Sequence, residues 1–265
     1  MVKLVIMVAG MSSRFGGTPK QFAIIGKNNE SLIEYSLNEA TLNKFNEIIF
    51  ITNENTEHLF KNKFGYIYNN IPIRYIQQYY DKNLRSRPWG TTDAICCLKQ
   101  LNNFDMEPFL IINGDDIYGK GAFKDCFRLI ENSHKNIIGI VNLIDTLPLE
   151  GNVNRGIVKV NNDTVVSIKE YLNINRNNTE LIKSYANINF LCLQPNIINE
   201  LDIILQNFKL KNINENKLEI LLPDNLNELI ENKKLDLNYF LIKNKIYGIT
   251  NKGDDIKLKN IFKDI

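Results

Sequence analysis

Cysteine and histidine are scarce in this chain of 265 residues. The cysteines are Cys96, Cys97, Cys126 and Cys192, without a Cys-x-x-Cys pair, and the histidines are His58 and His134. A structural zinc site needs thiolate and imidazole ligands at short, paired spacings, so this composition speaks against one. A reduced cysteine usually acts as a small buried hydrophobe, and we expect that of all four.

Long apolar runs and blocks of one charge are also absent. No stretch approaches the roughly 20 apolar residues of a membrane span, and the N-terminal MVKLVIMVAG is too short for a signal peptide. The 32 Lys and Arg residues nearly balance the 30 Asp and Glu residues, and no basic block could track a phosphate backbone. We expect a cytoplasmic globular protein without nucleic-acid or membrane partners.

Three common sequence signatures of enzymes are missing. The chain has no Gly-x-Gly-x-x-Gly dinucleotide fingerprint, no P-loop ending in Gly-Lys-Ser/Thr and no Gly-x-Ser-x-Gly nucleophile elbow. A dehydrogenase, a P-loop nucleotidase and a hydrolase with a serine elbow are therefore poor interpretations.

Apolar strands and amphipathic helices alternate in the first half of the chain. The runs at 4–9, 48–52 and 109–113 are apolar throughout, as expected of parallel strands covered on both faces. Further strands are predicted at 71–76 and 137–141, and helices at 31–42, 91–101 and 122–132; Ser31 and Glu34 form a capping-box pattern. This alternation predicts an α/β fold with a Rossmann-like, mainly parallel mixed sheet flanked by helices.

The pattern loosens after residue 150. Strands are predicted at 156–160, 165–172 and 186–193, and helices at 216–232 and 255–262. No repeat or low-complexity linker divides the chain. We expect a single domain, 1–265, with a small β addition in its C-terminal half.

A basic, glycine-containing loop follows the first predicted strand. The stretch MVAGMSSRFGGTPK contains Gly10, Gly16 and Gly17 together with Arg14 and Lys20. Backbone N–H groups approach an anion closely only where side chains are absent. The loop is therefore suited to binding phosphate.

A second polar loop follows the strand at 71–76. Gln77 and Gln78 end that strand, and a glutamine amide can offer a donor and an acceptor to a base edge. In RSRPWGTTDAI, Gly90 indicates that something planar or bulky passes close to the backbone. Thr91 or Thr92 can cap the helix that follows.

A third loop, NGDDIYG, places Asp115 and Asp116 directly after the strand at 109–113. Carboxylates at the carboxyl end of a strand suit Mg²⁺ bound together with substrate phosphates. Because adjacent residues point in different directions, only one of the two is expected to reach the metal. All three loops are expected to follow neighbouring parallel strands and to meet at one edge, where they would form a nucleoside triphosphate site.

Several stretches of this chain resemble the sugar-phosphate nucleotidyltransferases, which activate sugar 1-phosphates and related phosphorylated alcohols. They are VAGMSSRFGGTPK, QQ, WGTTDAI, NGDDIYG, RGIV, NINF, LLPDNLNELI and IYGITNKGDD, in that order along nearly the whole chain. The resemblance implies a nucleotidyltransferase (GT-A-like) fold, with a nucleotide-binding half at 1–145 and an acceptor-binding half at 146–265.

The resemblance also implies a role for individual residues. The nucleotide would be contacted by Ala9, Gly10, Ser12, Ser13, Gln78, Gly90 and Thr91. The catalytic residues would be Arg14, which grips the triphosphate, and Lys20, which bridges the reacting phosphates. The Mg²⁺ ligands would be Asp115 and Asp254, with Asp255 as the alternative to Asp254. The acceptor would meet Glu170 and Asn189.

The acceptor side departs from the family pattern. Glu170-Tyr171-Leu172 stands where many relatives have Glu-Lys-Pro, so a lysine often used on the acceptor phosphate is missing. The implied reaction is attack of an acceptor phosphate oxygen on the α-phosphorus of a nucleoside triphosphate, CTP or UTP, with release of pyrophosphate. The acceptor is either a sugar 1-phosphate or a phosphorylated amino alcohol or amino-acid derivative.

Two other classes of function stay open from the sequence. A metal-dependent glycosyltransferase also ends a strand in acidic residues, but it has no use for the Arg and Lys of the N-terminal loop. A non-catalytic nucleotide-binding regulator would be expected to lose Lys20 or the aspartate pair, and the chain keeps both. The oligomeric state is not encoded in any pattern that we recognise.

Overall fold

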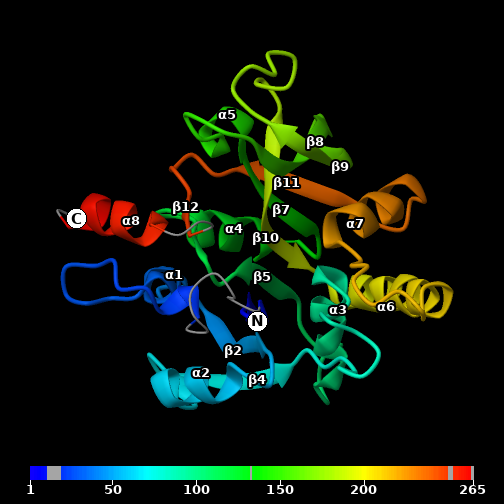
Figure 1. Cartoon of the computed structure of the whole chain (residues 1–265), viewed down its shortest axis with the longest axis horizontal. Helices are drawn as coiled ribbons and strands as arrows, with labels where there is room; N and C mark the ends of the chain where they lie inside the picture. The colour runs from blue at the N-terminus through cyan, green and yellow to red at the C-terminus, as the bar shows by residue number, and fades with distance from the viewer. Residues whose placement is uncertain (11–18, 132, 250–252, 264–265) are drawn as a thin grey trace.

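A ten-stranded sheet runs through the protein in the order β3-β4-β2-β1-β5-β10-β7-β11-β9-β8, and β6 and β12 form a separate two-stranded sheet (Figure 1). The computed structural model describes residues 1–10, 19–131, 133–249 and 253–263. The strands are β1 (Val2–Met7), β2 (Phe45–Thr52), β3 (Ile67–Tyr68), β4 (Ile71–Gln77), β5 (Phe109–Asn113), β6 (Asp116–Ile117), β7 (Asn136–Asn142), β8 (Val153–Asn161), β9 (Thr164–Ile174), β10 (Tyr185–Leu193), β11 (Leu237–Leu241) and β12 (Tyr247–Gly248). The helices are η2 (Lys20–Phe22), α1 (Leu32–Thr41), α2 (Glu57–Phe64), α3 (Thr91–Cys96), η3 (Cys97–Gln100), α4 (Ala122–Ile130), α5 (Leu143–Thr146), α6 (Pro195–Lys211), α7 (Leu222–Glu231) and α8 (Asp254–Phe262), of which η2 and η3 are 3-10 helices.

The strands β4, β2, β1 and β5 pair in parallel. Leu4 and Ile6 of β1 belong to one core cluster, whereas Val5 between them belongs to the other. Helices α1, α2 and α4 cover the first face of the sheet, and α3, α6 and α7 cover the second (Figure 1). Burial on both faces explains why these strands read as continuous apolar runs.

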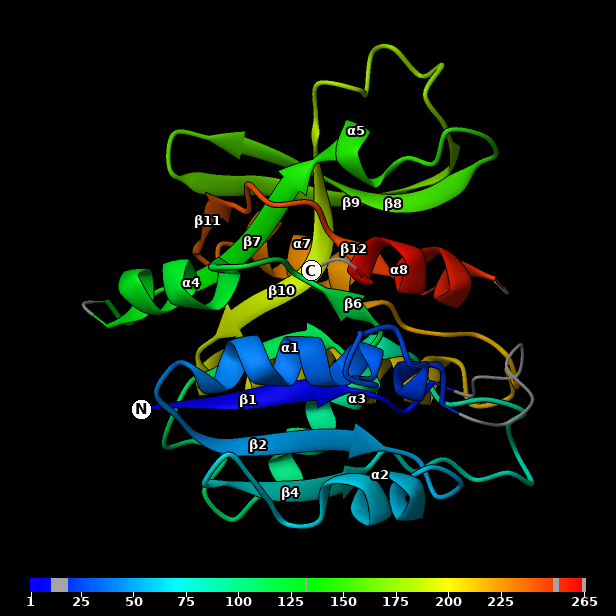
Figure 2. The same cartoon turned by 90° about the vertical axis from the view of Figure 1, so that its left-hand side faces the viewer.

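Antiparallel pairing joins the second half of the chain to the first. Strand β10 lies between β5 and β7 and is antiparallel to both, and β8 and β9 form an antiparallel pair at the end of the sheet (Figure 2). The two halves therefore share one sheet. The expected mixed α/β fold with a β addition is confirmed.

The carboxyl ends of the parallel strands lie level with each other. Met7 pairs with Asn113, and Thr52 pairs with Gln77. The predicted loops therefore do leave the sheet at one edge. The expectation that their strands are all neighbours is wrong, however, because β2 lies between β1 and β4.

Other predicted elements differ from the structure. The expected helix at 216–232 begins only at Leu222, because the preceding residues pair with the loop before α3. The helix expected at 91–101 is α3 followed by η3. The helices α2, α5 and α6 and the 3-10 helix η2 were not predicted at all. No helix within the described residues is both long and apolar enough to cross a membrane.

Candidate active site

A cavity of about 300 Å³ opens at the carboxyl edge of the parallel strands. Its lining includes five of the residues that the sequence predicts for the nucleotide, namely Ala9, Gly10, Gln78, Gly90 and Thr91. Asn113 at the end of β5 lines it as well, and Glu219 and Leu221 enter from the second half of the chain. The volume is in the range of small-molecule sites.

One wall of this cavity is fixed by backbone hydrogen bonds between two distant segments. Ile220 N donates to Trp89 O at 2.7 Å, and Thr92 N donates back to Ile220 O at 3.4 Å. Gly90 has φ +112°, and a Cβ there would lie 2.9 Å from Ile220 N and closer still to Ile220 O. The close approach expected at Gly90 is thus made by the chain itself, and Gly90 also lines the cavity.

The two threonines after Gly90 hold the second half of the chain and do not cap α3. Leu222 N donates to Thr91 Oγ1 at 2.8 Å, and Thr92 Oγ1 donates to Asn225 Oδ1 at 2.7 Å. Gly90 itself is the N-cap of α3, without a side-chain capping bond. The predicted capping role is therefore wrong, and the hydroxyls instead tie α3 to α7.

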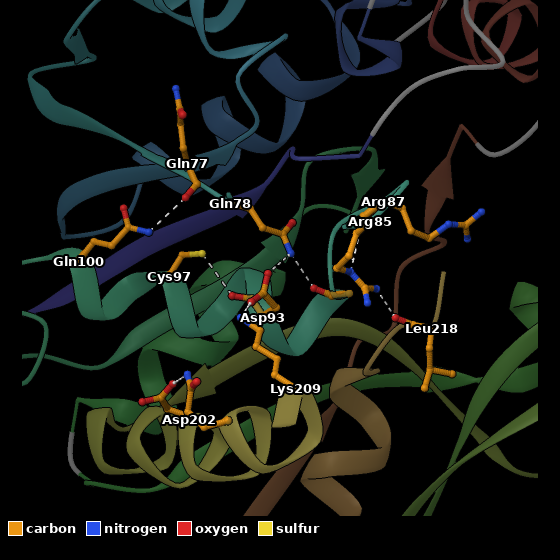
Figure 3. A network of polar contacts seen from close by, with 12 residues as sticks. Gln77, Gln78, Arg85, Arg87, Asp93, Cys97, Gln100, Asp202, Lys209 and Leu218 are labelled. Carbon is orange, nitrogen blue, oxygen red and sulfur yellow. Dashed lines mark hydrogen bonds and ion pairs between the residues drawn. The ribbon is translucent and has the colours of Figure 1, made fainter. Parts of the chain in front are cut away.

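Arg85 and Trp89 also stabilise the contact between the loop before α3 and the segment before α7. The Arg85 guanidinium stacks on Trp89, with its Cζ atom 3.3 Å from the ring centroid, and donates to the carbonyl oxygen of Glu215. It also donates to the carbonyl oxygen of Leu218 (Figure 3). Arg85 is only 4% exposed. Sequence reasoning missed this role, because nothing local to Arg85 marks a partner 130 residues away.

Lys20 and Asp115 form an ion pair. Lys20 Nζ also donates to Ile249 O at 2.9 Å, and Ile249 N donates to Asp115 O at 3.2 Å. About a quarter of each charged side chain is exposed, 23% for Lys20 and 26% for Asp115. The predicted catalytic lysine and the predicted metal ligand thus lie together. Asp115 is two residues beyond Asn113, which lines the cavity.

Asp116 follows Asp115 directly and begins β6. Burial and the neighbouring Asp115 carboxylate raise the pKa of Asp116 to about 7. The Asn113 side-chain amide donates to Asp116 Oδ2 at 2.8 Å, which opposes that rise. Of the two aspartates, Asp115 is the one paired with Lys20. That only one of the two reaches a metal stays a prediction.

Asn189 connects the acceptor half to the nucleotide cavity. Its φ is +54°, at an irregularity of β10, and its N–H donates to Asn187 Oδ1 at 2.9 Å. Its Nδ2 donates to Asn113 Oδ1 at 3.4 Å. This predicted acceptor residue therefore contacts a residue that lines the cavity.

Glu170 lies on β9 opposite Gly156 of β8. Burial raises the pKa of Glu170, and the charge of Asp224 adds to that rise, whereas the charge of Arg155 lowers it. Arg155 lies opposite Tyr171, the position where the resemblance expects a lysine. Sequence reasoning noted RGIV but did not assign this arginine to the site.

Asp254 is the first residue of α8, five positions after Ile249. Its carboxylate pairs with Lys257 at 3.3 Å. Within the described residues no group of three or more His, Cys, Asp or Glu side chains is arranged to hold a metal. The predicted Ser12, Ser13 and Arg14 lie outside the described residues.

Three solved structures have the same fold at low sequence identity. A Bacillus anthracis protein assigned as a glucose-1-phosphate thymidylyltransferase matches with a TM-score of 0.73 at 14% identity, covering 100% of this chain and 96% of its own. The inositol-1-phosphate CTP transferase from T. maritima gives 0.68 at 14%, covering 99% and 96%. CTP:phosphocholine cytidylyltransferase from Streptococcus pneumoniae gives 18% identity over 98% of both chains. No curated protein matches the chain by sequence.

The fold is the mixed α/β fold that these nucleotidyltransferase structures share. The model of the nucleotidyl transferase family matches residues 3–240. The chain belongs to this family, and it is a nucleotidyltransferase. The resemblance described from the sequence motifs is confirmed.

Proposed function

We propose that the enzyme transfers a nucleoside monophosphate from CTP or UTP to a sugar 1-phosphate or a similar small phosphorylated acceptor, with release of pyrophosphate. One observation carries this proposal. Five residues that the sequence predicts for the nucleotide line a single cavity. Asp115, which pairs with Lys20, lies just after β5, whose last residue also lines that cavity. The family assignment and the Streptococcus pneumoniae neighbour support the reaction class.

Both substrates are anions, so the residues act mainly by neutralising and aligning them. The Lys20 ammonium is placed to stabilise charge on the phosphoryl group under attack. Its bonds to Asp115 and Ile249 O fix its position without burying it. The acceptor phosphate supplies the nucleophilic oxygen, so no covalent enzyme intermediate is required.

The side chains predicted to hold a metal fit Mg²⁺ better than a softer ion. Asp115 and Asp254 offer carboxylate oxygens, and Mg²⁺ commonly takes one or two carboxylates together with substrate phosphates. When bound, the ion would neutralise phosphate charge. Asp115 would then share its carboxylate between the ion and Lys20. Lys20 has three N–H donors, of which Asp115 and Ile249 O take two, so one would remain for a phosphate oxygen.

On the acceptor side, Arg155 and Glu170 offer one cation and one carboxylate. Arg155 donates to Thr146 O at 3.2 Å and carries a charge that both Asp116 and Glu170 sense. We infer that Arg155 takes the place of the missing lysine toward the acceptor phosphate.

A second acceptor class is favoured by the charges beyond Glu170. Asp224 raises the pKa of Glu170 further, so two carboxylates repel each other at this end. A cationic group on the acceptor would relieve that repulsion. This observation favours a phosphorylated amino alcohol or amino-acid derivative as the alternative acceptor.

The test is a grid of nucleoside triphosphates against phosphorylated acceptors with Mg²⁺, monitored as pyrophosphate release. We expect turnover with a pyrimidine triphosphate, its loss on chelation and its return on adding Mg²⁺. Asp115→Asn should lower turnover at least about 100-fold, while Asp125→Asn on the exposed face of α4 should not. Nucleotide binding without pyrophosphate release for any pair would instead indicate a regulator.

A further inference from the structure

The amide of Gln78 is held in one orientation. Its Nε2 donates to Gly90 O at 2.9 Å and to Asp93 Oδ2 at 2.8 Å, and the residue is 5% exposed (Figure 3). A primary amide has two N–H donors, and both are used here. Turning the amide over would set its oxygen against two acceptors, so Gln78 cannot offer its N–H groups to a ligand in the cavity.

The oxygen of the same amide is the atom left for the cavity. Within the described part of the chain, no hydrogen bond to Gln78 Oε1 is formed, and Gln78 lines the cavity. In Figure 3 the Gln78 nitrogen faces Asp93 and its oxygen points the other way. The expectation that this residue provides both a donor and an acceptor is therefore narrowed to an acceptor alone.

Asp93 depends in turn on a residue from the second half of the chain. Asp93 is 4% exposed, and its Oδ1 accepts a hydrogen bond from Lys209 Nζ at 2.5 Å. Lys209 lies in the last turn of α6, 116 residues away in sequence. Both carboxylate oxygens of Asp93 therefore accept a hydrogen bond, Oδ1 from Lys209 and Oδ2 from Gln78.

We propose that Asp93 and Lys209 are positioning residues for base recognition, which hold Gln78 as an obligate acceptor for an N–H group on the edge of the nucleotide base. This inference rests on the proposed function. It adds that the enzyme discriminates against any base that presents only a hydrogen-bond acceptor to Gln78 Oε1. Lys209 touches neither the base nor the phosphates in this arrangement, because it acts through Asp93.

The chain provides a matched control. Lys99 of η3, the 3-10 helix that follows α3, forms a second ion pair to α6 with Asp202, and neither residue lines the cavity. Lys99→Met therefore removes a comparable link to α6 without altering the support of Gln78.

The experiment measures dissociation constants of CTP, UTP, ATP and GTP by calorimetry, with tripolyphosphate as a probe that lacks a base. Asp93→Asn places an amide next to Gln78. It should lower the ratio of the dissociation constant of the weakest-binding nucleotide to that of the tightest-binding one at least about tenfold. Lys209→Met should lower it less, Lys209→Arg should restore it, and Lys99→Met should leave it unchanged. The affinity for tripolyphosphate should stay the same in all four variants.

A double variant separates positioning from simple loss of stability. Gln78→Leu should abolish the same discrimination, and adding Asp93→Asn to Gln78→Leu should change it no further. The inference is wrong if Asp93→Asn and Lys209→Met keep the wild-type ratio of dissociation constants and show only a lower melting temperature, as Lys99→Met would. If the wild-type protein binds none of the four nucleotides, the proposed function fails first.

Discussion

The two ends of the candidate site are built by different means. The base end, made of Gln78, Gly90, Thr91 and Thr92 with their partners, is held by hydrogen bonds that cross between distant segments. The charged end, made of Lys20, Asp115, Asp116, Arg155 and Glu170, is built from ionisable groups whose charges act on one another. The first arrangement stabilises the fold, whereas the second brings charges of both signs close together, some of them like charges that repel each other.

This contrast teaches where function and stability can be separated. A buried hydrogen bond contributes to folding, and losing one partner leaves the other unsatisfied. Charged groups brought together for phosphate binding contribute little to folding or oppose it. Substitutions at the charged end should therefore change turnover more than stability, and those at the base end should do the reverse.

The largest effect is expected at the charged end. Lys20→Ala removes the cation that we propose for the reacting phosphates, and it should lower kcat at least about 100-fold, equal to about 2.7 kcal/mol in the barrier. The melting temperature should change little, because the Lys20 side chain is partly exposed. Pyrophosphate release and thermal unfolding measure the two effects, and Lys124→Ala on the exposed face of α4 is the control. Near wild-type turnover would remove Lys20 from the mechanism.

At the base end, Gly90→Ala should affect both binding and stability. The added Cβ would strike the Ile220 backbone, and φ +112° is strained for any side chain. We expect the KM for the nucleotide to rise about tenfold and the melting temperature to fall by several degrees. Gly65→Ala is a matched control, since φ is +61° there and a Cβ would meet nothing within 4 Å. Equal effects of the two variants would mean that backbone strain alone is responsible.

Local sequence signals predicted much of this architecture. The strands at 4–9, 48–52 and 109–113 were found because burial on both faces makes them apolar throughout. The Ser31–Glu34 capping box is also present, since Ser31 N donates to Glu34 Oε2 at 2.8 Å. The helix α6 was missed although Ile197, Leu201 and Leu205 follow helical spacing, so there the signal existed and was overlooked.

The long-range hydrogen bonds and ion pairs of the site could not have been predicted from local sequence signals. Lys209 reaches Asp93 across 116 residues, and Thr92 reaches Asn225 across 133. Lys209 belongs to none of the quoted motifs, and the motif LLPDNLNELI, which contains Asn225, does not show what Asn225 contacts. Both contacts exist only once the sheet has brought α3, α6 and α7 to one face. Gly90 was singled out correctly as a place of close approach, but its neighbour Ile220 depends on the same long-range folding.

A smaller effect is expected from Thr92→Val. The Thr92 hydroxyl is fully buried and donates to Asn225, which is 7% exposed. Losing this bond should cost about 1–3 kcal/mol of unfolding free energy, without a change in kcat beyond about twofold. Denaturant unfolding and steady-state turnover check the two parts, with Thr41→Val at an exposed hydrogen bond as the reference. A large loss of kcat with normal stability would break the contrast between the two ends.

The smallest effect concerns the pH dependence contributed by Glu170. Its pKa is raised in the folded protein above the ordinary value of 4.5 by burial and by Asp224. The folded state therefore holds this proton more tightly than the unfolded chain, so the stability that Glu170 contributes is present below pH 4.5 and is lost as the pH rises through the raised pKa.

The variant Glu170→Gln tests this, because a glutamine side chain does not titrate. Its melting temperature relative to the wild type should be about 1–3 °C higher at pH 8 than at pH 4, and the same comparison for the exposed Glu180→Gln should be flat. A flat difference for Glu170→Gln as well would mean that the charged end does not oppose folding.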